Sequence, residues 1–277
     1  MTSTFIQLES RLSKDPNATG SNYTISFPYG GIQLPSLPDE SSYEYGVNLH
    51  SAKIYNTIPN VSSGYGTNTI SFKRNDADPY TVITLPDGQY NYTAINSYIH
   101  SYLFDNGFYG GTVDNPKFGI SLGINLATSQ FVFSFREPTT TGESGATKYT
   151  VRVDDKINVL LGFNANQELT ITDDLDTRSS PNRPDITFGV NEISINCDIV
   201  QTAFTNGYTN QAIEFYTPNK PPGALLNITP TKKTFLPLGN RQIKKIQIYL
   251  MDNLGRSVDL RNEETVVTLE IKLLKRY

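Results

Sequence analysis

The sequence predicts an all-β protein: a single jelly roll, which is an eight-stranded antiparallel β-sandwich, with an α+β insertion. Short runs of alternating apolar residues, separated by clusters of Gly, Pro and Asn, recur along most of the chain, as they do in sandwiches and barrels. The 17 Tyr and 14 Phe residues and a charged fraction of only 18% favour strands over helices. Clear helical periodicity is confined to the middle of the chain, which predicts the insertion there.

The composition argues against several classes of protein. With 23 basic and 27 acidic residues, the formal net charge of −4 argues against a dedicated nucleic-acid binder. No apolar run approaches the ~20 residues of a membrane helix. The first residues lack the basic and apolar regions of a signal peptide. The single cysteine, Cys197, can form neither an internal disulfide nor a Cys-based zinc site.

The N-terminal part of the chain predicts an arm followed by three strands. Residues 1–20 are polar and carry little periodicity, so we expect an extended arm. Alternating runs bounded by Gly and Pro follow. The strands expected from them are Tyr23–Phe27, Tyr45–Tyr55 and Asn68–Phe72.

Residues 80–184 predict a small α+β insertion domain. Apolar residues spaced by three and four between Ile95 and Leu103 predict a helix that begins near Asn91 and ends before Gly107. A second, short helix is expected within 156–163. The strands expected here are Thr81–Leu85, Ile120–Leu126, Phe131–Phe135 and Tyr149–Val153.

Five further strands are expected after residue 185. They are Ile193–Ile199, Ile213–Tyr216, Leu225–Thr229, Ile246–Leu250 and Val267–Leu273. Together with the three earlier strands they supply the eight of a single jelly roll, which is expected to be formed by residues 21–79 plus 185–277.

The last two strands have the clearest alternation. Their apolar residues are expected to face the core: Ile246, Ile248, Leu250, Val267, Leu269 and Ile271. A turn at Asp252–Gly255 should pair the two strands as a hairpin and leave Gln247 and Glu270 on the outer face.

The candidate catalytic residues do not form a recognisable arrangement. Gly119-Ile-Ser-Leu-Gly123 matches the G-x-S-x-G nucleophile elbow, but that motif needs a strand-to-helix turn and here falls within a strand. In the α/β-hydrolases that carry this motif, the catalytic histidine follows the serine in the sequence, whereas His50 and His100 both precede Ser121. We therefore expect Ser121 to keep its hydroxyl in solvent and His100 to be solvated, and we expect no enzyme.

No metal or cofactor site is expected. Two histidines cannot supply a His-based triad, and Cys197 alternates inward as a small core residue. Asp154-Asp155 and the cluster Asp173-Asp174-Asp176 could ligate calcium through oxygen. Neither has the Gly-punctuated spacing of a calcium loop, so solvated charge clusters are favoured.

Three further motifs have ordinary explanations. Glycosylation sequons are expected by chance where Asn and Thr are abundant, here at Asn17, Asn22, Asn60, Asn91 and Asn227. Gly64-Tyr-Gly66 lacks the trailing glycine or lysine of a phosphate-binding loop. Lys272, Lys275 and Arg276 close the last strand, where they could contact packaged nucleic acid or protect a sheet edge. We expect nucleic-acid contact to be weak or absent.

The C-terminal segment carries a family resemblance. Residues Ile246–Leu260 and Glu263–Ile271 resemble the closing hairpin of penton proteins, the minor capsid proteins at the vertices of virophages and Polinton-like viruses. Other segments are similar in the same order along the chain: Tyr23–Pro28, Tyr43–Ile54, Thr81–Leu103 with its Leu-Pro-Asp-Gly-x-Tyr turn, Leu160–Phe163 and Val190–Ile199.

The resemblance implies a structural capsid protein without catalysis or cofactors. It implies a homopentamer at each icosahedral vertex of the virion, assembled inside the host cell. The implied partners are further copies of the chain, the double jelly-roll major capsid protein and other minor capsid proteins. A charge-poor, tyrosine-rich surface suits such contacts, because interface cores are enriched in aromatic residues and depleted of Lys and Glu.

Two functions from other classes remain open at this stage. A viral receptor-binding or carbohydrate-binding β-sandwich of the fibre or lectin kind would also use exposed tyrosines and Asn-rich loops. An enzyme such as a β-sandwich glycosidase is a third candidate, but no paired acid and orienting group can be named in the sequence.

Overall fold

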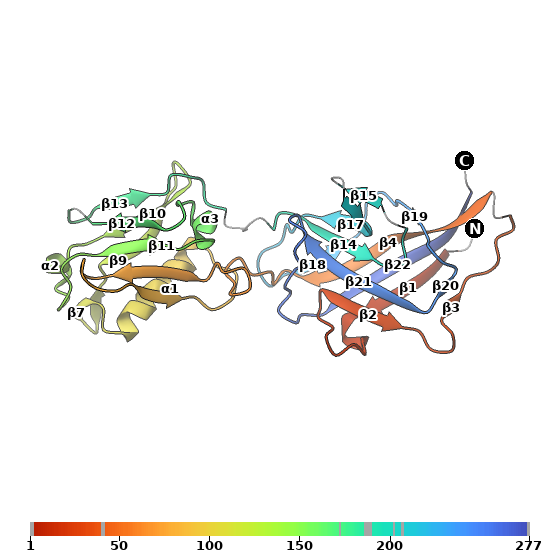
Figure 1. Ribbon diagram of the computed structural model, residues 1–277, viewed down its shortest axis with the longest axis horizontal. Helices are drawn as coiled ribbons and strands as arrows, with labels where there is room; N and C mark the ends of the chain where they lie inside the picture. Colours follow the sequence, from red (N-terminus) through yellow and green to blue (C-terminus); the bar gives the residue numbers. More distant parts are fainter. Residues whose placement is uncertain are drawn as a thin grey trace. The chain divides into compact units, whose positions relative to one another are not determined.

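The computed structural model describes residues 3–39, 42–171, 173–185, 190–201, 203–205 and 208–275. The chain divides into two compact units, which are described separately (Figure 1). The jelly-roll unit comprises Met1–Ile58 and Gly189–Tyr277, and the insertion unit comprises Pro59–Phe188. Among the described residues, no helix combines the length and the apolar character needed to span a bilayer.

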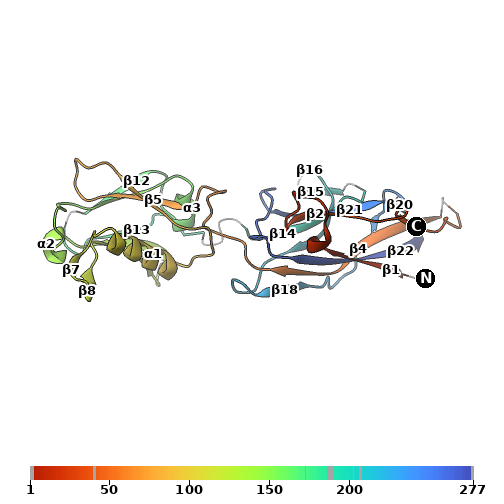
Figure 2. The same ribbon diagram turned by 90° about the horizontal axis from the view of Figure 1, so that it is seen from below.

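The jelly-roll unit consists of two antiparallel sheets. Sheet A has the order β1 (Ser3–Glu9), β22 (Thr265–Lys275), β4 (Tyr43–Tyr55) and β18 (Leu225–Ile228), with β19 (Leu236–Pro237) also paired to β4. Sheet B has the order β17 (Ala212–Tyr216), β14 (Ile193–Cys197), β21 (Lys245–Asp252) and β2 (Asn22–Ser26). Figure 2 shows the two layers, with β2 and β21 on one side and β18, β22 and β1 on the other.

The strand order confirms the predicted jelly roll. Counted along the chain over these eight strands, the first pairs with the eighth (β1 with β22), the second with the seventh (β2 with β21), the third with the sixth (β4 with β18) and the fourth with the fifth (β14 with β17). The ladders β22–β4 and β21–β14 then join these pairs into two four-stranded sheets. A long antiparallel ribbon rolled onto itself produces this pattern.

The inward faces of both sheets form one core, as the alternation predicts. The six apolar residues expected to face the core are each at most 1% exposed: Ile246, Ile248, Leu250, Val267, Leu269 and Ile271. The hairpin expected between their strands is wrong, however, because β21 belongs to sheet B and β22 to sheet A.

The turn after β21 explains the missing hairpin. The Asp252 carboxylate accepts hydrogen bonds from the backbone N–H groups of Leu254 and Arg256, which closes a tight turn. The chain then crosses to the other sheet, and Val258 and Leu260 are buried in the core on the way. An eight-stranded sandwich needs such crossings, because its seventh and eighth strands lie in different layers.

A β-bulge in β4 keeps both halves of this long strand apolar on the inner face. Thr268 lies opposite Ser51 and Leu269 opposite Leu49, so His50 is the extra residue. The inward positions therefore change parity at His50, from Val47 and Leu49 to Ala52 and Ile54.

One of the eight predicted jelly-roll strands is removed, and one strand that was not predicted is added. Residues 1–20 are not an extended arm, because β1 pairs with β22 over its whole length and buries Ile6 and Leu8. Residues 68–72 do not belong to the jelly roll, because β5 (Thr69–Lys73) pairs with strands of the insertion unit. The number of strands was right because these two errors cancel.

The described part of the insertion unit has two larger sheets, the small pair β7 (Gly110–Thr112) and β8 (Asn115–Lys117), and three helices. The four-stranded sheet has the order β12 (Gln167–Thr170), β11 (Thr150–Val153), β5 and β6 (Thr81–Thr84). The three-stranded sheet has the order β13 (Thr177–Ser179), β10 (Gln130–Phe135) and β9 (Ile120–Asn125). The helices are α1 (Tyr92–Asp105), α2 (Pro138–Thr141) and α3 (Ile157–Leu161).

The boundaries of the insertion unit at residues 59 and 188 replace those expected at 80 and 184, since β5 pairs with β6 and β11 of this unit.

Helix α1 matches the prediction closely. The Asn91 side chain accepts a hydrogen bond of 2.8 Å from the backbone N–H of Ala94, which caps the first turn. Ile95, Ile99 and Leu103 are buried and join the core of the insertion unit.

The remaining short elements complete the two units. They are η1 (Ser10–Leu12), the pair β3 (Ile32–Gln33) and β20 (Gln242–Ile243), the pair β7 (Gly110–Thr112) and β8 (Asn115–Lys117), and the pair β15 (Ala203–Thr205) and β16 (Tyr208–Asn210).

Candidate assembly surface

The outer face of sheet B carries uncharged side chains along its middle, with the Asp198 carboxylate at the border, where it accepts a hydrogen bond of 2.8 Å from the Gln247 N–H. The outward residues there, called face B below, are Thr24, Ser194, Asn196, Phe215, Gln247, Tyr249 and Met251. The register places Ser194 between Phe215 and Met251, so two apolar side chains flank a small one across three strands. Phe215 is 41% exposed. Charge-free surfaces with exposed aromatic groups are typical of interface cores.

Hydrogen bonds within sheet B and to the neighbouring Gln211 side chain pair polar side chains of face B. Asn196 is 1% exposed, and its amide donates to the Ser194 hydroxyl at 3.0 Å and to the Tyr249 carbonyl at 3.1 Å. The Tyr249 hydroxyl donates to Gln211 Oε1 at 3.2 Å, and Gln211 Nε2 donates to the Asp198 carbonyl. The side chains of Ser194, Asn196, Gln247 and Tyr249 are thus already paired within the chain, which favours contact through shape and apolar area.

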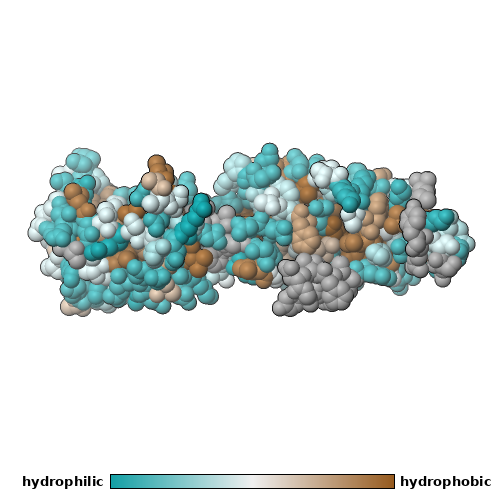
Figure 3. Space-filling view, turned by 90° about the horizontal axis from the view of Figure 1, so that it is seen from above, coloured by the Kyte–Doolittle hydropathy of each residue, from teal (hydrophilic) through white to brown (hydrophobic). Residues whose placement is uncertain are grey.

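The outer face of sheet A has a different character. Phe5, Glu270 and Asn48 form one row across β1, β22 and β4. Phe5 is 54% exposed and packs edge-on against His50, with ring centroids 4.9 Å apart. Apolar side chains elsewhere on the jelly-roll unit are also exposed: Tyr55, Leu225 and Leu254. Figure 3 shows apolar side chains gathered over the jelly-roll unit on the face that it presents.

Glu270 is covered, although alternation correctly places it on the outer face. It is 5% exposed, and its carboxylate accepts hydrogen bonds from Lys233 Nζ at 2.5 Å and Ser3 Oγ at 2.7 Å. Lys233 and Ser3 together hold the pKa of the Glu270 carboxyl below its ordinary value, against a smaller effect of burial. The expectation that Glu270 is solvent-facing is therefore corrected.

The structure brings Ser121 and His100 together, which the sequence did not predict. His100 Nε2 lies 3.0 Å from Ser121 Oγ and 3.2 Å from the Ile120 carbonyl, and its ring stacks on Phe118. Burial lowers the pKa of His100, and the Ile120 carbonyl partly opposes this. Both side chains are half-buried and not fully solvated as expected, because α1 packs on β9.

This contact does not make a nucleophilic pair. The Ile120 carbonyl only accepts hydrogen bonds, so it favours a proton on His100 Nε2, and a nitrogen that carries a proton cannot take one from Ser121. Ser121 also lies in mid-strand, opposite Ser134 of β10, with no strand-to-helix turn. The pair fastens α1 to the sheet.

The glycines of the G-x-S-x-G motif have unequal roles. A Cβ on Gly119 would lie 2.0 Å from the Tyr149 ring, whereas a Cβ on Gly123 would meet nothing closer than 4.0 Å. Gly119 is therefore required for packing of Tyr149 and not for an elbow.

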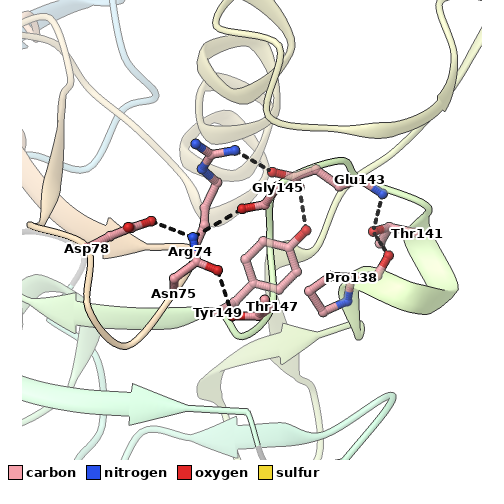
Figure 4. A network of polar contacts seen from close by, with 9 residues as sticks. All are labelled: Arg74, Asn75, Asp78, Pro138, Thr141, Glu143, Gly145, Thr147 and Tyr149. Atoms are coloured by element: carbon pink, nitrogen blue, oxygen red, sulfur yellow. Dashed lines mark hydrogen bonds and ion pairs between the residues drawn. The ribbon is translucent and has the colours of Figure 1, made fainter.

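Tyr149 belongs to a polar network that holds the loop after β10 (Figure 4). Its hydroxyl donates a short hydrogen bond to the Glu143 carboxylate, which also pairs with Arg74 at 3.2 Å. Burial, and next the Glu143 carboxylate, raise the pKa of Tyr149 far above its ordinary value. The Arg74 guanidinium lies 4.2 Å from the centre of the Phe108 ring. These contacts stabilise the insertion unit.

The remaining sequence candidates are structural. Cys197 is fully buried, and burial raises the pKa of its thiol to about 12. Asp154 pairs with Arg152, and Asp176 pairs with Arg178. In the described part of the chain, no group of three His, Cys, Asp or Glu side chains could hold a metal ion.

The other motifs also have structural explanations. Asn60 is 8% exposed and bonds the backbone of Tyr90, and Asn91 caps α1. Gly66 lies in the turn after Ser63. Lys272 and Lys275 lie on β22, and Arg276 lies outside the described residues.

Comparisons with known proteins give similarity of structure and none of sequence. No family model matches the chain, and no curated protein matches it. The mavirus penton protein is similar with a TM-score of 0.48 and 8% identity, covering 99% of this chain and 100% of the other. A chain of the Sputnik virophage, solved by cryo-electron microscopy, is similar with a TM-score of 0.43 and 10% identity, covering 97% of each chain.

Proposed function

We propose that this chain is a structural capsid protein, a penton that forms homopentamers at the icosahedral vertices of a virion. The observation that carries the proposal is face B, a set of uncharged side chains in the middle of the outer face of sheet B, on a jelly roll whose core is already complete. Jelly rolls are a recurrent architecture of viral capsids. The penton-like pattern of residues 246–271 adds support.

The geometry suits a ring of copies. A cyclic pentamer needs a heterologous contact, in which one surface of a copy meets a different surface of the next. Face B and the outer face of sheet A are such a pair of different surfaces, and Phe5, Tyr55 and Leu225 give sheet A exposed apolar area. A stable contact of standard size would bury roughly 1,600 Å². The outer rim of the ring would then meet the major capsid protein and other minor capsid proteins.

Light scattering of the purified full chain tests the proposal. The expected mass at high protein concentration is about five times 30.8 kDa. Phe215→Glu with Met251→Glu should reduce the mass to that of one copy, because two charges would be desolvated in the contact. Val82→Glu is the matched control, since Val82 is 46% exposed on a strand of the insertion unit.

Two results would overturn the proposal. One is a mass that the face B substitutions leave unchanged. The other is a particle reconstruction that places the chain in the hexagonal faces instead of at the vertices. Glycan binding by a stable monomer would favour the carbohydrate-binding alternative.

A further inference from the structure

One end of the jelly-roll unit, the terminal end, gathers basic side chains from distant parts of the sequence. Lys245 begins β21 opposite Ser26 at the end of β2, and Lys275 ends β22 opposite Tyr43 at the start of β4. These registers place the starts of β4 and β21 and the ends of β2 and β22 at one end of the sandwich. Figure 1 shows β3 and β20 there as well.

Five basic residues of the described chain lie at the terminal end: Arg241, Lys244, Lys245, Lys272 and Lys275. Lys244, Lys245 and Lys275 are exposed. The acidic residues described at this end are Asp39, Glu44 and Asp198. Two of these carboxylates accept local hydrogen bonds, Asp39 from the Ser42 hydroxyl and Asp198 from the backbone N–H of Gln247.

The opposite end of the same unit is mixed in charge, because the basic residues Arg11, Lys53, Lys220, Arg256 and Arg261 lie there beside the acidic ones. Glu192 lies just before β14, Asp252 ends β21, and Asp259, Glu263 and Glu264 precede β22. The jelly-roll segments together have 14 basic and 13 acidic residues, whereas the insertion segment has 9 and 14. The net charge of −4 therefore comes from the insertion segment, and the jelly-roll unit is nearly neutral.

An exposed aromatic ring lies beside these lysines. Tyr29 is fully exposed in the turn Pro28–Gly31, which is closed by a hydrogen bond of 3.1 Å from the Gly31 N–H to the Pro28 carbonyl. The Phe27 N–H donates to the Lys244 carbonyl, which places the turn next to that lysine. Tyr29 has φ +56°, in the left-handed region where Asn or Gly would cost less. Nothing in the packing of the unit requires a tyrosine at this position.

We propose that the terminal end binds nucleic acid, with lysines on the phosphates and Tyr29 stacked on an unpaired base. Cationic grooves with an aromatic platform are the usual means of holding single strands. An anionic membrane surface fits less well, because interfacial binding uses several apolar side chains inserted together. At this end of the described chain Tyr29 is the one fully exposed aromatic ring. The expectation of weak or absent nucleic-acid contact came from the net charge, which does not show where the fold gathers basic residues.

Fluorescence anisotropy with the full chain and a labelled single strand of about 20 nucleotides tests this. If about four phosphates are contacted, affinity should fall roughly fifty-fold between about 50 and 200 mM salt. The triple variant Lys244→Glu, Lys245→Glu, Lys275→Glu should lose at least about ten-fold in affinity at low salt. Its matched control, Lys53→Glu, Lys117→Glu, Lys220→Glu, changes the net charge equally at other exposed positions and should lose much less.

Tyr29→Asn tests the stacking ring, since Asn tolerates the backbone conformation of the turn. It should weaken single-strand binding by about five-fold or more and leave binding to a duplex of the same length nearly unchanged. Equal losses in the two triple variants, or no binding at low salt, would overturn the proposal. Binding to phosphatidylserine vesicles without binding to DNA would also overturn it. Because the measurement does not depend on ring formation, a failed pentamer and a failed nucleic-acid site are distinguishable.

Discussion

Lys233 Nζ lies 2.5 Å from Glu270 Oε2, although the two residues are 37 positions apart in the sequence. The segment between β18 and β19 carries Lys233 over the outer face of sheet A, where it covers a carboxylate in the middle of β22. The Lys233 side chain itself is 48% exposed, so the pair lies at the boundary between buried and solvated surface. This contact fixes a loop to the sheet.

Glu270→Ala should lower the free energy of unfolding by about 1–2 kcal/mol, because Ser3 and Lys233 lose a charged acceptor but can reach water. Leu269→Ala, at the adjacent core position, should cost about 2–5 kcal/mol. Denaturant melts of both variants at low protein concentration provide the measurement. A larger loss for Glu270→Ala than for Leu269→Ala would contradict this assignment of faces.

The same ion pair should make stability depend on pH in acid. The folded pKa of Glu270 is lowered from 4.5, so its contribution is present above that value and is lost as the pH falls through the lower folded pKa. Lys233→Ala should flatten the decline of stability below about pH 4.5, compared with the unaltered protein. An identical acid profile in the two proteins would show that Lys233 does not cause the pKa shift.

His100 should act in a separate pH window. Its folded pKa is lowered from 6.5 by burial, so protonation favours the unfolded state. The stability of the insertion unit should therefore fall as the pH decreases below about 6.5. His100→Gln should remove that slope while retaining a hydrogen-bond donor toward Ile120. A slope that persists in His100→Gln must come from another group.

The two glycines of the G-x-S-x-G motif give a matched pair of substitutions. Gly119→Ala should destabilise the insertion unit by about 1–3 kcal/mol, because its Cβ would overlap the Tyr149 ring. Gly123→Ala should change stability by less than about 0.5 kcal/mol, because no atom lies closer than 4.0 Å to the added Cβ. Thermal unfolding measures both. Similar costs would mean that packing against Tyr149 is not the reason for Gly119.

The sequence predicted the faces of the strands better than their partners. Alternation correctly oriented Leu269 and Leu250, because burial on one face leaves a period of two. It could not show that β21 and β22 lie in different sheets, since a tight turn at Asp252 is compatible with either outcome. β1 was missed because only Ile6 and Leu8 of its residues are buried apolar side chains.

Contacts between distant segments were beyond the reach of the sequence patterns. The Ser121–His100 contact depends on how α1 is placed over β9. The burial of Glu270 depends on the path of the segment between β18 and β19, which carries Lys233. The outer face of sheet B could be predicted only in part. Alternation places Ser194, Asn196 and Asp198 of one strand and Gln247, Tyr249 and Met251 of another on an outer face, but it does not show that these strands are neighbours. Phe215 joins them through the β14–β17 register.

The revised boundaries predict that the two units fold independently. The core of the jelly-roll unit and the core of the insertion unit are separate clusters that share no described residue. Replacing residues 59–188 with a flexible Gly/Ser linker of about ten residues should leave a β-sandwich that still unfolds cooperatively, since lengthening such a loop costs little.

A second replacement, of residues 80–184, is the comparison that tests these boundaries. It retains β5 but removes β6 and β11, so Ile70 and Phe72, each 1% exposed in the intact chain, would be open to solvent on an unpaired strand. This variant should aggregate or bind a hydrophobic dye, while the variant lacking 59–188 should not. Circular dichroism and light scattering measure both outcomes. Cooperative folding of the variant lacking 80–184, together with unfolding of the one lacking 59–188, would mean that β5 supports the jelly roll after all.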